Sequence, residues 1–449
     1  MSDMNARKVA ADVLLRVEKE GAYSHIALKE AFREGGLNPR DRGLVTELVN
    51  GTIRNQATLD HVVDSFLKKK NLRPEIRSVL RMGVYQLLYM NRIPVSAAVN
   101  ESVKLVHLYR MNSQKGLVNA VLRNVDRNRD RDFFLDLTDP VRKLAVTTSH
   151  PDWVVSLFIR RFGQEQARQL LEYNNRPAPN VVRINTLKTD EATLRRELEE
   201  AGFAAESGPA PGTLVLSGRG SVNDLQSCKQ GHFVVQSPSS VLAALALGAR
   251  PGENVLDCCA APGGKSFVLA QEMDNRGTLL STDLHEHKME LIRRGAAFLG
   301  IECVDAQVRD WTVSQPDLDD RFDRVLVDAP CSGLGMLAKR ADLRWRKEQG
   351  DIPRLAELQR SILTSASRAV RPGGMLLYST CTLTREENAD QRKWFLETCG
   401  DFEPCSLDLD DVFQDPKARL HLQEGHLEIT PFAHGMDGFY MAGFRRRKP

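Results

Sequence analysis

Two cysteines carry the most information in this sequence, because each one ends a short apolar segment. Cys331 ends the segment 327–331 (VDAPC), and Cys381 ends the segment 378–381 (YSTC). Upstream, residues 255–266 (VLDCCAAPGGKS) run from an apolar stretch through a Gly-Pro turn into a predicted helix. Such a strand, turn and helix often hold a nucleotide-like cofactor in α/β proteins. Two thiols beside a cofactor loop suggest covalent chemistry on a base.

Methyl transfer to C5 of cytosine is a reaction that needs a thiol. C5 is a poor nucleophile, but addition of a thiolate to C6 makes an enamine-like ring whose C5 can attack a sulfonium methyl group. A free thiol is mostly protonated near neutrality, so helix dipoles or nearby cations must favour its thiolate. Asp328, three residues before Cys331, is well placed to act as an acid near N3 of the base. The residues alone do not rank Cys331 against Cys381.

Acidic residues follow the predicted strands at the edge of the sheet where such folds bind ligands. Asp283 ends the second strand, 26 residues after Asp257, near the spacing at which a carboxylate accepts hydrogen bonds from ribose hydroxyls. Asp310 follows the third strand and could contact an adenine amine. The turn at 260–264 (AAPGG) lacks the G-x-G-x-x-G spacing that brings backbone amides to a pyrophosphate. These features favour S-adenosylmethionine over NAD, although each acid alone could be a helix cap.

The elements that would position these residues form an alternating pattern in residues 236–449. Strand, loop and helix repeat, which predicts an α/β domain with a doubly wound parallel sheet. The predicted strands are 254–257, 277–283, 303–308, 324–328, 374–379 and 438–444, and the predicted helices are 265–273, 287–298 and 352–369.

Two further units are predicted before this domain. Residues 1–140 repeat apolar side chains at helical spacing and predict an all-α domain, which a charged linker at 127–132 follows. Residues 141–235 predict a small α+β domain. Its predicted elements are a helix ending near Tyr173, strands at 181–185 and 213–216, and a helix at 191–202.

Composition is that of a soluble protein with two or three globular domains. Of 449 residues, 42% are apolar and 27% are charged. No apolar run approaches the roughly 20 residues needed to span a bilayer, and no signal-peptide core follows the N-terminus, so we expect a cytoplasmic protein without a membrane partner. Eight cysteines make no disulfide framework, and none has the spacing of a structural zinc site, so we expect no metal. No feature determines the oligomeric state, and we expect a monomer.

Basic residues are concentrated near the N-terminus. Residues 1–140 contain 23 Lys/Arg and 17 Asp/Glu, whereas the remainder contains 39 and 42. This bias fits a phosphate-binding accessory domain or, with about equal weight, a solvated helical surface. A second basic segment, 337–347, contains Trp345 and suits phosphate contacts and stacking on RNA, unless Trp345 belongs to the core. The densest basic positions are Lys68, Lys69, Lys70, Arg73, Arg77 and Arg81.

Motifs of the sequence resemble those of the RNA (cytosine-5)-methyltransferase family, namely 257–265 (DCCAAPGGK), 328–333 (DAPCSG) and 379–382 (STCT). The segments 183–188 (RINTLK) and 437–440 (DGFY) are also similar to family segments. The helical N-terminal part resembles the antitermination factor NusB, and the whole layout is similar to family members that act on the small ribosomal subunit. One departure is 236–240 (QSPSS), where relatives tend to carry an acidic residue.

This resemblance implies a Rossmann-like domain that transfers a methyl group from S-adenosylmethionine to C5 of a cytidine in 16S ribosomal RNA. It implies that Cys381 is the nucleophile, that Cys331 assists product release and that Asp328 contacts the target base. DNA cytosine-5 methyltransferases use the cysteine of a Pro-Cys pair, which would favour Cys331 instead. The residues implied to bind the cofactor are Cys259, Ala260, Ala261, Pro262, Gly263, Gly264, Lys265, Asp283, Asp310 and Asp328.

Two alternative functions are compatible with the same features. One is a methyltransferase that acts on transfer RNA or DNA. The other is a non-catalytic RNA-binding or antitermination protein that has kept a nucleoside pocket. The presence of both cysteines together with every predicted cofactor acid argues against the second alternative.

Overall fold

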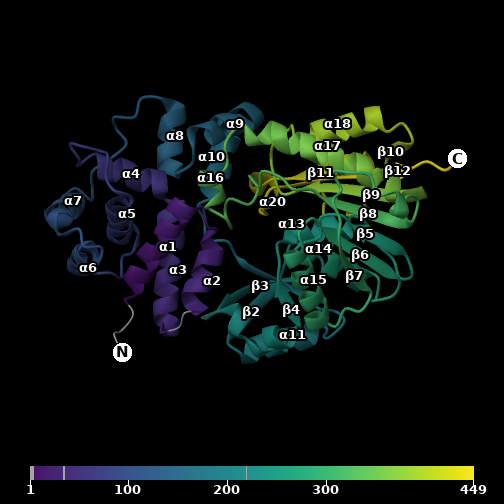
Figure 1. The fold of residues 1–449 in the computed structure, drawn as a ribbon, viewed down its shortest axis with the longest axis horizontal. Coiled ribbons are helices and arrows are strands. Elements are labelled where there is room, and N and C mark those ends of the chain that lie inside the picture. The colour runs from purple at the N-terminus through teal and green to yellow at the C-terminus, as the bar shows by residue number, and fades with distance from the viewer. Residues whose placement is uncertain (1–4, 34–35, 219) are drawn as a thin grey trace. The chain divides into compact units, whose positions relative to one another are not determined.

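The chain forms two compact units (Figure 1). The parts that the computed structural model describes are residues 5–33, 36–218 and 220–449. The first unit comprises Met1–Arg176 and Leu337–Lys347, and the second comprises Pro177–Met336 and Glu348–Pro449. In the described parts of the chain, no helix combines the length and the apolar character needed to cross a membrane. The division at residues 140 and 235 expected from the sequence stays a prediction.

Helices build the first unit, as its apolar periodicity predicts. Polar caps begin several of them: Asn5 accepts a hydrogen bond from the Arg7 N–H (2.9 Å), and Asn38 accepts one from the Asp41 N–H (2.9 Å). The helices of this unit are α1 (Ala6–Glu20), α2 (Ser24–Arg33), α3 (Pro39–Arg54), α4 (Gln56–Asp64), α5 (Pro74–Tyr89), α6 (Val95–Leu108), η1 (Asn112–Gln114), α7 (Lys115–Arg127), α8 (Pro140–Thr148), α9 (Asp152–Phe162), α10 (Gln164–Tyr173) and α16 (Leu343–Arg346).

The segment 337–347 is part of the interior of the first unit, although it is distant from the N-terminal helices in sequence. Trp345 packs against the hydrophobic core of this unit, and its Nε1 donates a hydrogen bond to the Ile53 carbonyl (2.9 Å). The Arg344 side chain is fully buried, and burial lowers its pKa to about 9. Its guanidinium donates to oxygens of Arg54, Ser149, Asn174, Asn175 and Leu337. Arg344 is thus buried and Trp345 packs against the core, which is the alternative that the sequence left open, and RNA contact by the exposed residues of this segment stays a prediction.

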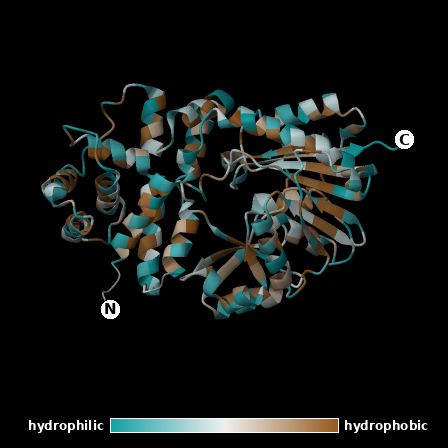
Figure 2. Ribbon diagram, in the orientation of Figure 1, coloured by the Kyte–Doolittle hydropathy of each residue, from teal (hydrophilic) through white to brown (hydrophobic). Residues whose placement is uncertain are grey.

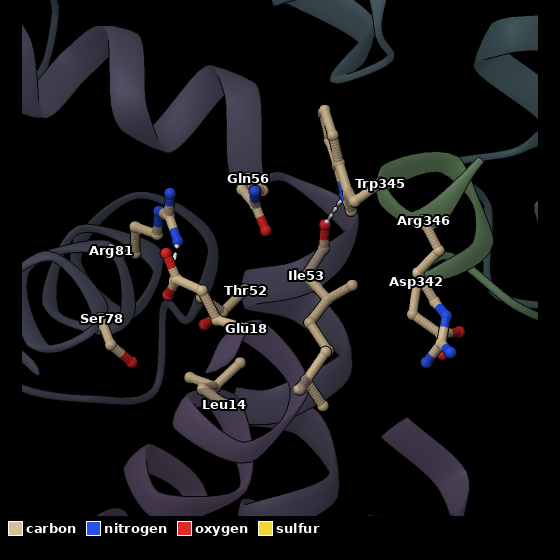
Figure 3. A pocket seen from close by; sticks show the side chains of 11 residues that line it. Leu14, Glu18, Thr52, Ile53, Gln56, Ser78, Arg81, Asp342, Trp345 and Arg346 are labelled. Carbon is tan, nitrogen blue, oxygen red and sulfur yellow. Dashed lines mark hydrogen bonds and ion pairs between the residues drawn. The ribbon is translucent and has the colours of Figure 1, made fainter. Parts of the chain in front are cut away.

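A cavity of about 150 Å³ lies inside the first unit between α1, α3, α5 and this segment (Figure 3). Asp342, Trp345 and Arg346 line one side of the cavity. The ion pair between Arg81 and Glu18 (3.2 Å) lies on the opposite side. Both parts of the chain are thus needed to close the interior, so a fragment lacking either part would expose apolar surface.

A small antiparallel sheet begins the second unit, with the strand order β2-β3-β1-β4. Asn185, in the family-like segment 183–188, ties this sheet to later parts of the unit. Its Nδ2 donates to the carbonyls of Gly231 (2.8 Å) and Leu299 (2.9 Å), and its Oδ1 accepts from Gln271 (3.0 Å). The elements are β1 (Asn180–Ile184), α11 (Glu191–Glu200), β2 (Phe203–Ser207), β3 (Thr213–Gly218), η2 (Val222–Asp224), α12 (Gln226–Gln230) and β4 (Phe233–Val235).

A large, mostly parallel sheet forms the rest of the second unit, with the order β10-β12-β9-β8-β5-β6-β7 and β11 beside β12. Its strands are strongly apolar, which Figure 2 shows in brown, as expected for strands covered by helices on both faces. The strands are β5 (Asn254–Asp257), β6 (Thr278–Asp283), β7 (Val304–Val308), β8 (Phe322–Asp328), β9 (Val370–Thr380), β10 (Phe402–Pro404), β11 (His426–Ile429) and β12 (Phe439–Arg446).

Helices connect these strands in the doubly wound manner predicted from the sequence. The predicted strands and helices of this part are all present within a few residues of their expected bounds. The strands β2, β4, β10 and β11 were not predicted, and β12 pairs antiparallel with β9. The helices are α13 (Pro238–Leu245), α14 (Gly264–Glu272), α15 (Glu286–Leu299), η3 (Pro316–Leu318), α17 (Asp351–Ala369), α18 (Ala389–Thr398), α19 (Pro416–Gln423) and α20 (Pro431–His434).

Candidate active site

The carboxyl ends of three adjacent parallel strands bring the predicted reactive residues to one edge of the large sheet. β5 ends at Asp257, β8 ends at Asp328, and β9 ends at Thr380, directly before Cys381. Strand pairing aligns Asp328 with Ser379, whose hydroxyl donates a hydrogen bond to the Asp328 carboxylate (2.8 Å). The strand order reverses between β5 and β8, and α/β proteins bind ligands outside the strand ends at such a point.

The loop between β5 and α14 is a tight turn fixed by its own backbone. Ala260 N–H donates to the Thr282 carbonyl on the neighbouring strand (2.8 Å), and Gly263 N–H donates to the Ala260 carbonyl (2.7 Å). Gly263 has φ of 105°, and a Cβ there would lie 2.4 Å from the Phe267 ring. Only glycine satisfies both constraints, so this position of the motif is needed for the turn itself.

Two carboxylates at this edge have opposite surroundings. Asp257 is buried, and burial raises its pKa to about 7 although Ser266 donates a hydrogen bond to it (2.7 Å). Asp328 is partly exposed and pairs with Lys265 (Nζ to Oδ2, 2.6 Å). Burial lowers the pKa of Lys265, but the charge of Asp328 and their hydrogen bond outweigh burial, so the pKa of Lys265 is raised. Lys265 is therefore a permanent positive charge in this part of the site at neutral pH.

The two predicted catalytic thiols lie against each other. The Sγ atoms of Cys331 and Cys381 are 3.2 Å apart, within hydrogen-bond distance for thiols. The hydrogen bond to Cys381, burial, and the negative charges of Glu387 and Asp328 raise the pKa of Cys331 well above its usual value. A negative charge on Cys381 in turn raises the pKa of Lys265. Lys265 therefore places a cation near Cys381.

The two remaining predicted cofactor acids follow neighbouring strands of the sheet. Asp283 ends β6 and pairs with Lys288 (3.0 Å), and strand pairing aligns it with Val308, two residues before Asp310. Asp310 accepts hydrogen bonds from the backbone and hydroxyl of Thr312, and these bonds lower its pKa. Asp310 therefore also serves as a local turn residue, and it caps no helix among the described elements.

Three protein families describe consecutive parts of the chain. The matches are the NusB family over residues 4–127, the ferredoxin-like domain of RsmF/B-like methyltransferases over residues 150–223, and the 16S rRNA methyltransferase RsmB/F over residues 244–445.

Full-length relatives have the same layout. The chain is 36% identical over 449 residues to the probable ribosomal RNA small subunit methyltransferase B of Bacillus subtilis. This match covers 100% of both chains. It is 33% identical over 447 residues to the ribosomal RNA small subunit methyltransferase B of Vibrio cholerae, which covers 98% of this chain and 97% of the relative. The chain belongs to the RsmB/F family of 16S rRNA methyltransferases.

Solved structures agree with this membership. A crystal structure of PH0851 is similar with a TM-score of 0.83 and 25% identity, covering 99% of each chain. The structure of NSun6 from Pyrococcus horikoshii with SFG is similar in fold, with a TM-score of 0.60 and 21% identity over 67% of this chain and 99% of that one. The expected order of a NusB-like domain, a small α+β domain and a Rossmann-like methyltransferase domain is thereby confirmed.

Glu387, a buried carboxylate beside the two cysteine loops, is not among the residues predicted from the sequence. Its Oε1 accepts hydrogen bonds from the Ser332 N–H (2.8 Å) and Gln359 (3.1 Å), and its Oε2 accepts from the hydroxyls of Ser332 (2.6 Å) and Thr384 (2.7 Å). The Ser332 hydroxyl also bonds with that of Thr382 (2.6 Å). Because Ser332 follows Cys331 and Thr382 follows Cys381, Glu387 holds the two RsmB/F cysteine loops together. Only its position shortly after the second cysteine motif hinted at this role.

Glu387→Gln is expected to disturb the spacing of the two thiols. The new amide would direct a donor at groups that already donate, so we expect a loss of about 1–3 kcal/mol in unfolding free energy and a kcat roughly tenfold lower, with a similar KM for RNA. Chemical denaturation and steady-state methylation assays measure both quantities. Glu386→Gln, on the exposed neighbouring residue, is the matched control. A variant with unchanged kcat would show that this carboxylate does not position the thiols.

The segment 236–240 contacts the start of α14. Gln236 accepts a hydrogen bond from Arg183 (2.8 Å) and donates to the carbonyl of Gly264, the first residue of α14 (3.0 Å). Ser237 donates to the carboxylate of Asp437 (2.6 Å), which belongs to the family-like segment 437–440. An amide at position 236 can thus bridge Arg183 and α14, which a carboxylate could not do because it donates no hydrogen bond.

Proposed function

We propose that the protein methylates C5 of a cytidine in 16S ribosomal RNA through a covalent bond between Cys381 and C6 of the base. The observation that carries this proposal is the pair of thiols 3.2 Å apart, beside the ion pair of Lys265 and Asp328. Membership of the RsmB/F family supplies the RNA substrate and the methyl transfer. C5 of cytosine is unreactive until a nucleophile attacks C6, and a thiol of this pair can supply that nucleophile.

The charges around the thiols favour Cys381 as the nucleophile. Asp328 and Glu387 place negative charge near Cys331, which raises its pKa, whereas Lys265 lies near Cys381. The Lys265 cation would stabilise a thiolate on Cys381, with the Cys331 thiol as its hydrogen-bond donor. The residue analysis alone could not rank the two thiols, and this electrostatic difference supports the ranking that the family resemblance implies.

The proposed reaction runs through one covalent intermediate. The Cys381 thiolate adds to C6 while Asp328 donates a proton to N3, and the resulting electron-rich C5 attacks the methyl carbon. S-adenosylmethionine, when bound, supplies that methyl group as a sulfonium. A base then removes the C5 proton with the assistance of Cys331, the electron pair expels the Cys381 thiolate from C6, and N3 returns its proton to Asp328. Proton and thiolate leave together, so the enzyme returns to its starting state.

The cofactor site proposed for this chain comprises the loop 259–265 with Asp283 and Asp310. Gly264 and Lys265 at the start of α14 are partly exposed at the sheet edge, where cofactors of this fold class bind. The Asp283 carboxylate ends β6, and within the described residues its ion-pair partner is Lys288 at 3.0 Å. It therefore retains free lone pairs that could accept hydrogen bonds from ribose hydroxyls.

Asp283→Ala is expected to weaken S-adenosylmethionine binding roughly 10- to 100-fold, because hydrogen bonds to a charged acceptor are lost. RNA binding should stay within about twofold of the parent, since the change is at the cofactor end of β6. Calorimetry with S-adenosylmethionine measures the first effect, and a filter-binding titration with RNA measures the second. Asp305→Ala, at an exposed position of β7, is the control. Equal cofactor affinity in Asp283→Ala and Asp305→Ala would remove Asp283 from the site.

The nucleoside product tests the proposed function directly. Ribosomal RNA from a strain that lacks the protein is incubated with the purified enzyme and labelled S-adenosylmethionine, and the digested nucleosides are separated. We expect label in 5-methylcytidine of 16S RNA and none in transfer RNA treated in parallel. Label in transfer RNA alone would support the alternative substrate, and label in another nucleoside would contradict C5 chemistry.

The exposed basic residues of the first unit are proposed to help bind RNA electrostatically. Arg77 and Arg81 already pair with acids of the same unit, but Lys68, Lys69 and Lys70 are exposed. Separately, an rRNA substrate implies that the enzyme acts in the cytoplasm. We also expect the protein to be a monomer. Because the first unit needs residues 337–347, deletion of residues 1–140 would not test this role cleanly.

Replacing Lys68, Lys69 and Lys70 by glutamine is expected to weaken RNA binding and flatten its salt dependence. Each lost phosphate contact reduces the slope of log K against log salt by about 0.7–0.9, so the slope should fall by about 2. Titrations at several salt concentrations measure it. Glutamine at Lys393, Lys417 and Lys448 removes three exposed charges from the second unit as the control. The same slope in both triple variants would show that Lys68, Lys69 and Lys70 do not bind RNA.

A further inference from the structure

Two histidines and a glutamate converge at the corner between α19 and β11. His421 lies in the last turn of α19, Glu424 follows the helix, and His426 is the first residue of β11. The three side chains thus come from six consecutive positions on a helix, a turn and a strand. None of them belongs to the cysteine and cofactor motifs.

The backbone of this corner is well fixed. Ala418 and Leu422 of α19 and Leu427 of β11 are buried in the same hydrophobic core. Gly425 makes the turn with φ of 77°, and a Cβ at this position would lie 2.5 Å from the Cys405 carbonyl oxygen. The chain therefore reverses tightly here, and the ends of α19 and β11 are held next to each other by packing on both sides.

The geometry of the three side chains is that of a cation site. One ligand atom from each of His421, Glu424 and His426 lies within 4.8 Å of the other two. The imidazole rings of His421 and His426 stack with centroids 4.9 Å apart. Nδ1 of His426 is buried and has no hydrogen-bond partner within the described residues. A buried ring nitrogen without a partner is costly, and a metal ion at this corner would offset the cost of bringing two imidazoles together.

We propose that His421, Glu424 and His426 bind one divalent transition-metal ion of the zinc class, with water as the remaining ligand. Zinc binds imidazole nitrogen and carboxylate oxygen at about 2.0–2.2 Å, which places tetrahedral ligand atoms about 3.4 Å apart. Small rotations of two partly exposed imidazoles and one exposed carboxylate would bring the ligand atoms from within 4.8 Å of one another to this separation. Two imidazoles in the set disfavour magnesium and calcium, which prefer oxygen ligands only.

The surrounding charges set the strength of this site. The Arg392 guanidinium donates to the backbone carbonyl of Glu424 (2.7 Å), so it holds the turn but also opposes a cation. The Glu424 carboxylate offsets that charge, and the carboxyl end of α19 contributes a partial negative charge. Removal of the Arg392 charge should therefore strengthen metal binding, whereas removal of either imidazole should weaken it.

Metal titration of the full-length chain tests the proposal. The protein is freed of metal with a chelator, and Zn²⁺ affinity is measured by competition with a chromophoric chelator. We expect one equivalent to bind, about tenfold or more weakly in His421→Gln and in His426→Gln, and more tightly in Arg392→Gln. Co²⁺ should give a visible spectrum of nitrogen and oxygen ligands without a sulfur-to-cobalt charge-transfer band. Mg²⁺ should not compete.

The outcomes separate this site from the thiols and from the methylation proposal. A sulfur charge-transfer band, or an equivalent of Zn²⁺ that is unchanged in both histidine variants, would overturn the proposal and assign the metal to cysteines. If His426→Gln fails to fold, His421→Gln decides alone, because His421 is on the partly exposed end of α19. Methyl transfer should be the same in the parent and in His421→Gln, since His421 is not part of the catalytic site.

Discussion

Cys381→Ala is expected to abolish methylation and to leave no covalent complex between protein and RNA. The side chain that attacks C6 is absent, so C5 never becomes nucleophilic, and activity should fall to the background of the assay. The affinities for RNA and for S-adenosylmethionine should stay within about threefold of the parent. Alanine removes one partly buried sulfur atom and leaves the ion pair between Lys265 and Asp328 in place. Labelled methyl transfer and denaturing electrophoresis of protein with RNA measure the two losses.

Retained turnover in Cys381→Ala would contradict the assignment of the nucleophile. The useful control is Cys399→Ala, which removes a partly buried free thiol that does not follow β8 or β9. That variant should methylate at the parental rate. A loss in both variants would indicate a general effect of thiol removal on folding, which a far-UV spectrum and a denaturation curve would reveal.

Cys331→Ala is expected to do the opposite: it should form the covalent complex and fail to release it. Cys381 remains and can attack C6, but the group 3.2 Å away that assists proton removal and elimination is missing. The variant should accumulate as a protein–RNA species that survives denaturing electrophoresis, with turnover reduced to about one methyl group per enzyme. Adding Cys381→Ala to the same chain should eliminate the trapped species.

The reverse pattern would show that the roles of the two thiols are exchanged. In that case Cys381→Ala would trap RNA and Cys331→Ala would not, as the Pro-Cys pair of DNA cytosine-5 methyltransferases suggests. The charges around the thiols argue against this pattern, because Asp328 and Glu387 raise the pKa of Cys331 and disfavour its thiolate.

Sequence reasoning located the strands of the large sheet because buried parallel strands are short apolar runs bounded by Gly, Pro and Asp. β5 at Asn254–Asp257 was predicted at its observed bounds for this reason. Asp328 pairs with Ser379, two residues before Cys381, because β8 and β9 are parallel strands that end at one edge. Whether these residues perform the proposed steps stays a prediction, as does the cofactor role of Asp310.

Tertiary contacts explain what the sequence could not predict. Arg344 and Trp345 lie in a basic segment that is typical of RNA contacts, yet they complete a core built from residues far away in the chain. Glu387 bonds to Ser332, 55 residues earlier, and periodicity contains no signal for such a pairing. The short strands β10 and β11 form only because β12 offers them a partner.

The bond between protein and RNA is the most direct test of covalent catalysis. The trapped complex of Cys331→Ala with 16S RNA is digested with protease and nuclease, and the linked peptide is sequenced by tandem mass spectrometry. The account predicts one cytidine nucleotide carrying an added methyl group, attached to the peptide that contains Cys381. Attachment at any other residue, or recovery of free peptide and unmethylated RNA alone, would contradict it.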